Sequence, residues 1–349
     1  MCRGCRDLRS GKQQDLRVPI QLIVSVLITN SVEAHYGFPR MVRAQNADLL
    51  LFYRVGTTHA YDDAAIAMRR SSDNGMSWSG EEILWRCEAG FSAHNPVAIV
   101  ASNGKVILWA SRFEYGPKLR HPNWWSISDN DGATWTAWSV FDPSPQHNCY
   151  YVTDSIHTSA GLLAADATFP LSGKGTCHTR IHFSRDDGFT WSCRSNLTSP
   201  ASNLGDEVAL IETETDSILC IQRDRGRADT FRFWSRDGGR TWSDSESIRG
   251  MLDCVLQRPF LTRLDETSYL LSGRDYERKR VVTYVSTDGG QTFGHRRELD
   301  SYQKDGGYTS VIALDSGKCL IAWYSDSHTQ PLKPDIKMAS GPAFPAPPD

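Results

Sequence analysis

The sequence predicts an all-β protein, a six-bladed β-propeller, and three observations support this prediction. The pattern S-x-D-x-G-x-T-W occurs five times, with its cleanest copy at residues 235–242. The copies start 51 to 57 residues apart, a period typical of propeller blades rather than of helical solenoids. The apolar segments between the copies are short and end at turn residues, and no helical periodicity of any length is present.

The repeated motif has a physical explanation as a tight turn that leads into a strand. Its Asp carboxylate can accept hydrogen bonds from nearby backbone N–H groups, and its Gly can take a positive φ. The Thr and Trp begin the next strand, where the indole can fill the space between neighbouring sheets. A generic Asp-Gly turn explains one copy but not five. The other copies lie at residues 71–78, 128–135, 184–191 and 286–293, with Ser77, Asn130 and Phe293 as departures from the pattern.

The same order of strands recurs between the motifs. Each blade begins with two apolar strands joined by a short turn, and a third strand leads into the motif. The expected strands of five blades are residues 38–44, 48–54 and 64–70; 96–101, 106–112 and 124–128; 154–158, 162–167 and 179–184; 207–212, 217–223 and 230–235; and 259–264, 268–274 and 280–286. The sixth blade starts at Tyr308, turns at residues 316–317 and continues through residues 319–324 and 336–338, without a motif.

The N-terminal segment supports two interpretations. Basic residues precede the apolar run 18–28, and residues 32–34 fit a cleavage site, as in a signal peptide of a secreted or periplasmic protein. Residues 22–30 can instead form the strand that completes the sixth blade of a cytoplasmic protein. We expect the propeller at residues 22–340, after an extension or partial signal peptide at residues 1–21. The Pro-rich residues 341–349 are expected to form a tail.

The composition excludes several functional classes. Apolar residues make up 40% and aromatic residues 10% of the 349 residues, which is ample for a packed β core. The formal net charge of −3 gives no reason to expect binding to nucleic acid or to a membrane surface. The N-terminal apolar run is too short to span a bilayer. Cys2 and Cys5 have no second pair at zinc-site spacing, so we expect no metal there. We also expect no cofactor, because the chemistry of the candidate residues described below needs none.

The strand order locates the functional face. The motif turns join third to fourth strands, so they lie on the opposite face from the loops that join second to third strands. These loops surround one end of the central channel, where a propeller usually has its site. Clustered guanidinium groups there would bind an anion, best of all a planar carboxylate, unless each pairs with a neighbour such as Asp224, Asp275 or Glu114. Four second strands end in arginine: Arg54, Arg112, Arg223 and Arg274.

Other reactive side chains are expected on the same face. A tyrosine beside a glutamate can act as a nucleophile while a nearby carboxylic acid protonates the leaving group. Taken singly, the two aspartates also fit solvated loop positions, and the two histidines also fit structural roles. The candidates are His59, Asp62 and Asp63 in the first long loop, His94 before the second blade, Glu207 at the start of blade four and Tyr308 at the start of blade six.

The five motifs resemble the Asp-boxes of the sialidase (neuraminidase) superfamily, whose members are six-bladed β-propellers. The resemblance runs from about Phe38 to Met338. Asp-boxes also occur in propellers that are not sialidases, so they specify the fold more strongly than the chemistry. Sialidases use a Tyr nucleophile activated by Glu, an Asp acid/base on a flexible loop, and three arginines that bind the carboxylate of the sugar.

The resemblance assigns these roles residue by residue. Residues 307–310 are similar to the segment of the nucleophile and imply Tyr308, and residues 206–210 imply Glu207 as its base. Asp62 or Asp63 lies in the loop of the acid/base. Where the family has Arg-Ile-Pro, the chain has Phe38, Pro39 and Arg40 in inverted order. The resemblance therefore implies Arg54, Arg223 and Arg274 as the carboxylate-binding set, with Arg278 as a competitor for the place of Arg274 and Arg40 as a further candidate. His59, His94 and Arg112 complete the expected substrate site.

The resemblance implies an exo-glycoside hydrolase that acts on a terminal acidic sugar, sialic acid or a related one, with retention through the Tyr nucleophile. Its expected partner is a carbohydrate substrate, and the sequence does not specify an oligomeric state. Two alternatives remain. One is a non-catalytic propeller that binds glycans or protein through the arginine-rich face. The other is a polysaccharide lyase with His59 and Tyr308 as base and acid.

Overall fold

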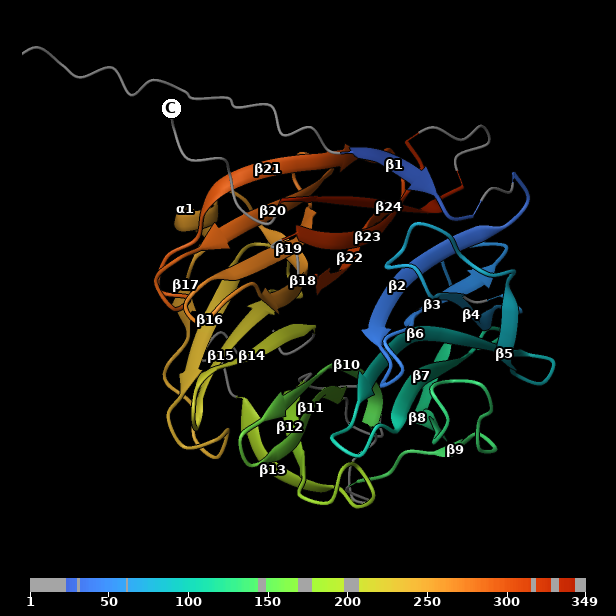
Figure 1. The fold of residues 1–349 in the computed structure, drawn as a ribbon, viewed down its shortest axis with the longest axis horizontal. Coiled ribbons are helices and arrows are strands. Elements are labelled where there is room, and N and C mark those ends of the chain that lie inside the picture. The colour runs from blue at the N-terminus through green and yellow to red at the C-terminus, as the bar shows by residue number, and fades with distance from the viewer. Residues whose placement is uncertain are drawn as a thin grey trace, which may run out of the picture.

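The computed structural model describes residues 23–29, 32–60, 62–143, 149–168, 178–197, 207–314, 318–327 and 333–342. Six four-stranded antiparallel sheets surround a central axis as the blades of a propeller (Figure 1). The first strands of neighbouring blades contact one another around the ring. The predicted all-β, six-bladed propeller is thus confirmed. Among the described residues, no helix is long and apolar enough to cross a membrane.

Strands follow one another outward from the axis in chain order, and the sixth blade takes its outermost strand from the N-terminus. Blades one to three contain β2 (His35–Arg43), β3 (Leu49–Gly56), β4 (Ala65–Ser71) and β5 (Glu82–Arg86); β6 (Phe91–Val100), β7 (Val106–Glu114), β8 (Leu119–Ser128) and β9 (Ser139–Val140); and β10 (Cys149–Thr158), β11 (Gly161–Thr168), β12 (His178–Ser184) and β13 (Ser192–Leu197). Blades four to six contain β14 (Val208–Glu214), β15 (Ser217–Arg223), β16 (Thr230–Ser235) and β17 (Glu246–Ser247), followed by the one-turn helix α1 (Arg249–Leu252); β18 (Leu256–Arg263), β19 (Tyr269–Asp275), β20 (Arg280–Ser286) and β21 (Gly294–Ser301); and β22 (Gly306–Ala313), β23 (Lys318–Ser325), β24 (Asp335–Pro342) and β1 (Ile23–Leu27).

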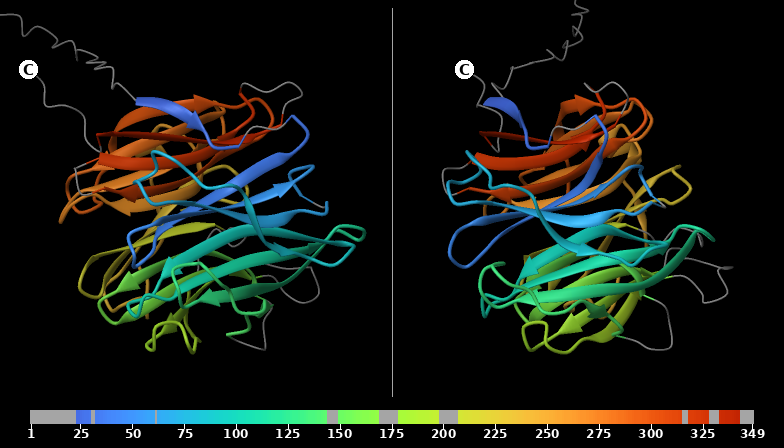
Figure 2. Two further views of the ribbon diagram at one scale, coloured as in Figure 1. Left: turned by 45° about the vertical axis from the view of Figure 1, so that its right-hand side comes forward. Right: turned by 90° about the vertical axis from the view of Figure 1, so that its right-hand side faces the viewer.

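Blade six joins the two ends of the described chain. β1 pairs antiparallel with β24, and the three views agree in placing these strands side by side (Figure 1, Figure 2). The hydroxyl of Thr29 donates to Asp335 at 3.0 Å and accepts the N–H of Ile336 at 2.9 Å. This is the pairing that the strand interpretation of residues 22–30 expects. β24 extends to Pro342, two residues past the expected end of the propeller at residue 340. The predicted turn at residues 316–317 lies outside the described residues.

The five motif turns share one hydrogen-bond pattern. In the copy at residues 235–242, the N–H and hydroxyl of Thr241 donate to Asp237 at 2.9 and 2.6 Å. The N–H of Gly239 donates to Ser235 at 2.8 Å, and Gly239 has a φ of +81°, which glycine adopts without strain. Equivalent bonds occur at Asp73, Asn130, Asp186 and Asp288. The motif therefore acts as the predicted turn.

These turns predict an acid-sensitive contribution to stability. Hydrogen bonds from Thr190 lower the pKa of Asp186 to about 2. Because the unfolded value is about 4, this stabilisation is present above pH 4 and is lost as the pH falls toward 2. Asn130 makes the same turn without a charge. We therefore expect Asp186→Asn to keep the turn but to lose less unfolding free energy between pH 5 and pH 2.5 than the wild type. Urea unfolding followed by Trp fluorescence checks this, with Asp187→Asn as the adjacent control. An equal acid loss in Asp186→Asn and wild type contradicts it.

β-Bulges interrupt the innermost strands at the rim of the channel and change the direction in which their side chains point. The register shifts between Gly37 and Arg40, between His94 and Val97, between Gln257 and Phe260, and between Gly306 and Thr309. Three bulges hold a residue of positive φ before a proline: Phe38 (58°), Asn95 (47°) and Arg258 (50°). Proline is tolerated there because a bulge needs no ladder hydrogen bond from its nitrogen. The strands expected to start at Pro96 and Pro259 therefore begin earlier, at Phe91 and Leu256.

Candidate active site

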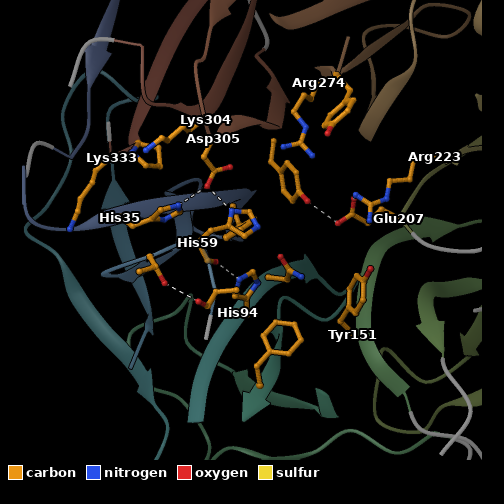
Figure 3. A pocket seen from close by; sticks show the side chains of 18 of the residues that line it. His35, His59, His94, Tyr151, Glu207, Arg223, Arg274, Lys304, Asp305 and Lys333 are labelled. Atoms are coloured by element: carbon orange, nitrogen blue, oxygen red, sulfur yellow. Dashed lines mark hydrogen bonds and ion pairs between the residues drawn. The ribbon is translucent and has the colours of Figure 1, made fainter. Parts of the chain in front are cut away.

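A cavity of about 690 Å³ opens at one end of the central channel (Figure 3). The starts of first strands and the loops between second and third strands line it, so it lies on the face that the strand order predicts. Six of the predicted site residues line this cavity: His59, His94, Glu207, Arg223, Arg274 and Tyr308. Seven further lining residues are not predicted by the sequence pattern: His35, Arg120, Arg227, Tyr276, Lys304, Asp305 and Lys333.

Tyr308 and Glu207 form a hydrogen-bonded pair in the cavity. The hydroxyl of Tyr308 donates to Oε1 of Glu207 at 3.1 Å, and Nη1 of Arg223 lies 2.5 Å from Oε2 of the same carboxylate. Burial, followed by the charge of Glu207, raises the pKa of Tyr308 to about 12 although Arg223 and Arg274 oppose the shift. Tyr308 is therefore protonated at neutral pH. It needs Glu207 as a proton acceptor in order to act as a nucleophile.

A glycine brings Tyr308 close to Arg274. Gly307 has a φ of +100°, and a Cβ there would lie 2.7 Å from the Cβ of Arg274. Any larger residue at this position would push the two strands apart. The bulge of β22 therefore depends on glycine, and it sets the guanidinium of Arg274 5.3 Å from the centre of the Tyr308 ring.

Arg274 is a buried cation that pairs with no carboxylate among the described residues. Only 8% of the residue is exposed, and its Nη1 donates to the carbonyl of Gly306 at 3.3 Å. The rings of Tyr276 and Tyr302 lie 5.6 and 5.9 Å from its guanidinium. Burial alone would lower the pKa of Arg274, but the neighbouring tyrosines raise it, so the group stays charged. A buried charge without a counter-ion is unfavourable, so this position favours an anionic ligand.

Positive charge predominates around the cavity. Its lining residues include four arginines and two lysines but only two carboxylates, Glu207 and Asp305. Figure 3 shows Arg223, Arg274 and Glu207 on one side, and His35, His59 and Asp305 on the other. Such a charge balance attracts anions into a cleft. The geometry therefore suits a ligand with at least one anionic group.

Three predicted arginines lie outside the cavity. Arg54 is fully buried, binds Asp62 and donates to the carbonyl of Thr58 at 2.5 Å. Arg40 pairs with Asp154 at 3.0 Å, and Arg112 pairs with Glu88 while its guanidinium lies 3.6 Å from the centre of the Phe91 ring. These guanidinium groups are already matched by carboxylates of the protein. Arg54 and Arg112, expected from the strand ends, and Arg40, expected from the resemblance, therefore hold the structure together and do not face the ligand space.

The two aspartates expected as acid/base also lie outside the cavity. Oδ2 of Asp62 accepts the N–H groups of Thr57 and Thr58 at 2.6 and 2.7 Å, and its Oδ1 binds Arg54. The side chain of Asp63 is 71% exposed and lies on the surface near Arg86. Asp62 therefore fixes the loop that carries His59, and neither carboxylate reaches the ligand space.

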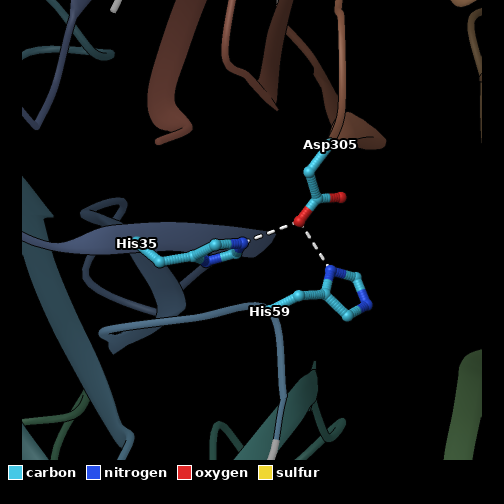
Figure 4. A group of neighbouring side chains, drawn as sticks. All are labelled: His35, His59 and Asp305. Atoms are coloured by element: carbon cyan, nitrogen blue, oxygen red, sulfur yellow. Dashed lines mark hydrogen bonds and ion pairs between the residues drawn. The ribbon is translucent and has the colours of Figure 1, made fainter. Parts of the chain in front are cut away.

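Asp305 is a cavity carboxylate that the sequence pattern does not predict. Its Oδ2 accepts hydrogen bonds from Nε2 of His35 at 2.7 Å and from Nδ1 of His59 at 2.6 Å (Figure 4). The hydroxyl of Tyr324 donates to its Oδ1 at 3.0 Å. Burial would raise the pKa of Asp305, but the hydrogen bonds from the two histidines outweigh it and hold the pKa well below its usual range. Its place three residues before Tyr308, at the start of a first strand, was the available signal.

His35, His59 and Asp305 have the composition of a metal site, with ligand atoms within 4.8 Å of one another. Their N–O distances of 2.6 and 2.7 Å are hydrogen-bond lengths, whereas two ligands of one tetrahedral zinc lie about 3.3 Å apart. Nη1 of Arg54 lies 3.5 Å from Nδ1 of His35. Because a guanidinium only donates, that nitrogen accepts, and Nε2 of His35 carries the proton given to Asp305. The residues therefore fit a hydrogen-bonded cluster better than a metal centre.

No family model and no curated protein matches the sequence. Solved structures do match. A protein of unknown function from Dyadobacter fermentans has a TM-score of 0.79 at 17% identity, covering 92% of this chain and 98% of that one. The Hadza microbial sialidase Hz136 has a TM-score of 0.73 at 22% identity, and the match covers 88% of this chain and 66% of that one. The NanB sialidase from Streptococcus pneumoniae has a TM-score of 0.70 at 14% identity, and the match covers 93% of this chain and 71% of that one. The chain has the sialidase propeller fold. At these identities the likeness shows the fold alone.

An aromatic residue lines the cavity of this sialidase-like propeller between several of the candidate site residues. Phe38, rather than Arg40, is the member of the inverted segment that lines the cavity. The centre of its ring lies 5.0 Å from that of Tyr308, 5.2 Å from that of His59 and 4.5 Å from that of His94. Tyr308 and His59 therefore flank one phenyl ring and face the same ligand space. Arg223 and Arg274 are the two members of the predicted carboxylate-binding set that line it.

Proposed function

We propose that the protein is a retaining exo-glycoside hydrolase that acts on a terminal acidic sugar, sialic acid or a related one. The observation that carries this proposal is the hydrogen-bonded pair of Tyr308 and Glu207 beside Arg274, a buried cation with no carboxylate partner among the described residues. The sialidase fold of the chain agrees with it. No cofactor takes part in this chemistry.

The pair can perform a double displacement. As the oxygen of Tyr308 forms a bond to the anomeric carbon, its proton passes to Glu207, and the bond to the leaving oxygen breaks with a proton supplied to that oxygen. Water then forms a bond to the same carbon, the bond to Tyr308 breaks, and Glu207 returns its proton to Tyr308. Two inversions give net retention.

Arg223 and Arg274 would hold the carboxylate of the sugar. A guanidinium binds a carboxylate through two parallel hydrogen bonds, which fixes the orientation of the sugar ring as well as its position. Because Arg223 also contacts Glu207 at 2.5 Å, it links the carboxylate subsite to the base of the reaction. Phe38 replaces a third guanidinium in this set, so the proposal extends to acidic sugars other than sialic acid.

The substrate class can be tested through Arg274. The assay compares fluorogenic aryl glycosides of sialic acid, of other ulosonic acids, of glucuronic acid and of glucose. We expect turnover of an acidic glycoside, and we expect Arg274→Met to lower its kcat/KM by about 10²-fold, because a charged hydrogen-bond partner of the carboxylate is lost. Thermal stability should not fall, since the variant removes an unpaired buried cation.

The matched control for this test is Arg112→Met. Arg112 lies near the end of β7, the equivalent strand of blade two, but it pairs with Glu88 outside the cavity. The variant should keep wild-type turnover. Equal losses in the two variants, or turnover of the glucose glycoside alone, would contradict an acidic substrate held by Arg274.

A polysaccharide lyase is a second candidate, favoured by the position of His59 and Tyr308 on either side of Phe38. In that reaction one group removes the proton next to the uronic carboxylate and the other protonates the leaving oxygen, so the product is unsaturated. Absorbance in the ultraviolet during digestion of uronic acid polymers therefore separates lyase from hydrolase. Retention on an acidic glycan without turnover would favour the non-catalytic propeller.

A further inference from the structure

We propose that His59, oriented by Asp305, is the proton donor and acceptor of this site, the role that the resemblance assigns to Asp62 or Asp63. The inference rests on the proposed glycoside hydrolase function. His59 lies on the same loop between β3 and β4 as those two aspartates, but it lines the cavity and they do not. Its side chain is 50% exposed, whereas those of His35 and Asp305 are 5% and 15% exposed.

Asp305 fixes which nitrogen of His59 carries the proton. Its carboxylate is an acceptor, and Nδ1 of His59 lies 2.6 Å from it, so Nδ1 is the donor. His35 and Tyr324 also donate to Asp305, which keeps this carboxylate charged. Figure 4 shows the other ring nitrogen of His59 pointing away from Asp305. That nitrogen, Nε2, is therefore presented to the cavity, as in catalytic Asp–His pairs.

Two buried carboxylates hold the backbones that present this pair. Asp62 accepts the N–H groups of Thr57 and Thr58 directly before His59. Asp326 in the same way accepts the N–H groups of residues 303, 304 and 305, at 2.6, 2.7 and 3.0 Å. The pair is therefore preorganised by fixed loops from two different blades. A position set in this way is typical of catalytic groups rather than of surface histidines.

A second histidine, His94, forms a hydrogen bond to the backbone of His59. Nε2 of His94 lies 2.7 Å from the carbonyl of His59. Burial lowers the pKa of His94 well below its usual range, so it is neutral and donates its Nε2–H to that carbonyl. The ionisable groups that face the His59 ring are thus Asp305 before β22, His35 on β2 and His94 on β6, with Arg54 behind His35.

The resulting reaction is balanced in protons. Figure 3 shows His59 and Asp305 on the side of the cavity opposite Glu207, so donor and nucleophile can act on opposite ends of the breaking bond. Protonated His59 gives its Nε2 proton to the glycosidic oxygen as that C–O bond breaks and the bond from Tyr308 forms. Neutral His59 then takes a proton from the water that attacks the anomeric carbon, and the bond to Tyr308 breaks. His59 ends protonated, ready for the next cycle.

The dependence on the leaving group tests this role, because a weakly basic phenolate leaves without a proton donor and an alkoxide does not. We expect His59→Ala to lower turnover of an activated aryl glycoside of the accepted acidic sugar less than about 10-fold. Turnover of the corresponding alkyl glycoside by the same variant should fall by about 10²- to 10³-fold. Added azide should restore aryl turnover and give a glycosyl azide. His121→Ala is the matched control, since His121 pairs with Glu114 at 3.0 Å outside the cavity, and it should lose neither activity.

The tautomer of His59 gives a readout that does not need a substrate. In ¹⁵N NMR spectra of histidine-labelled protein, neutral His59 should carry its proton on Nδ1, and Asp305→Asn should reduce this form in favour of Nε2–H. Loss of aryl and alkyl turnover by the same factor in His59→Ala overturns the role of His59 but leaves the hydrolase standing. Absence of wild-type turnover on every acidic glycoside overturns both. An Nε2–H tautomer in the wild type overturns the orientation by Asp305.

Discussion

Replacing Tyr308 by phenylalanine is expected to lower turnover of an acidic aryl glycoside by about 10³-fold or more, because the variant lacks the oxygen that attacks the anomeric carbon in the proposed mechanism. The ring itself should stay in place, since it packs 5.0 Å from the ring of Phe38 and beside Arg274. Glu207 keeps its ion pair with Arg223. Binding of a non-hydrolysable thioglycoside, measured by calorimetry, should therefore change little.

The matched control for this variant is Tyr53→Phe. Tyr53 is also buried and also donates to a glutamate, with 2.8 Å between its hydroxyl and Glu81, but it lies outside the cavity. It should keep turnover close to that of the wild type. Unchanged turnover in Tyr308→Phe would rule out the Tyr nucleophile, and a loss of thioglycoside binding equal to the loss of turnover would point to misfolding instead.

Removal of the Asp62 carboxylate is expected to act on stability first. Asp62→Ala leaves Arg54, whose side chain is fully buried, without its counter-ion and frees the N–H groups of Thr57 and Thr58. Breaking a buried ion pair on one side destabilises proteins by about 3–5 kcal/mol. Urea unfolding should show a loss of this size. Asp63→Ala, at the neighbouring exposed position, should change the unfolding free energy by about 0.5 kcal/mol or less.

This pair of variants separates the role expected from sequence from the role expected from structure. A catalytic acid/base at position 62 predicts a variant that is stable and inactive. A loop-holding carboxylate predicts a destabilised variant that keeps part of its activity under strongly stabilising conditions. Full stability combined with lost alkyl glycoside turnover in Asp62→Ala would restore the original assignment.

The fold could be predicted because its determinants are local and repeated. Each motif turn forms from its own residues, as the bonds from Thr241 to Asp237 show. The spacing of the five motifs, together with the strands that follow the last one, then gives the number of blades. The same register places Glu207 and Tyr308 at starts of first strands, and Arg223 and Arg274 at ends of second strands. These four residues reach the cavity because a propeller brings those strand ends together.

The rest of the site depends on contacts that no local pattern specifies. Asp62 and Asp305 are both loop carboxylates, and only Asp305 faces the cavity. This difference follows from their distant partners, because Asp62 binds Arg54 whereas Asp305 accepts hydrogen bonds from His35 and His59. The bulge at Phe38 turns its side chain into the cavity through a positive φ before proline, a conformation that is rare for this residue type. Side-chain direction after such a bulge follows from three-dimensional packing.

The closure of the ring by β1 has a consequence for the time at which this protein becomes functional. Thr29 and Asp335 are hydrogen-bonded across 306 positions of the chain. Blade six is therefore complete only when β1 pairs with β24, which lies at the other end of the described chain. Non-local pairing of this kind folds slowly. Asp305 and Tyr308 both belong to that late segment. Until blade six has folded, the cavity therefore lacks the part of its wall that carries these two residues, and the proposed reaction has to wait for this pairing.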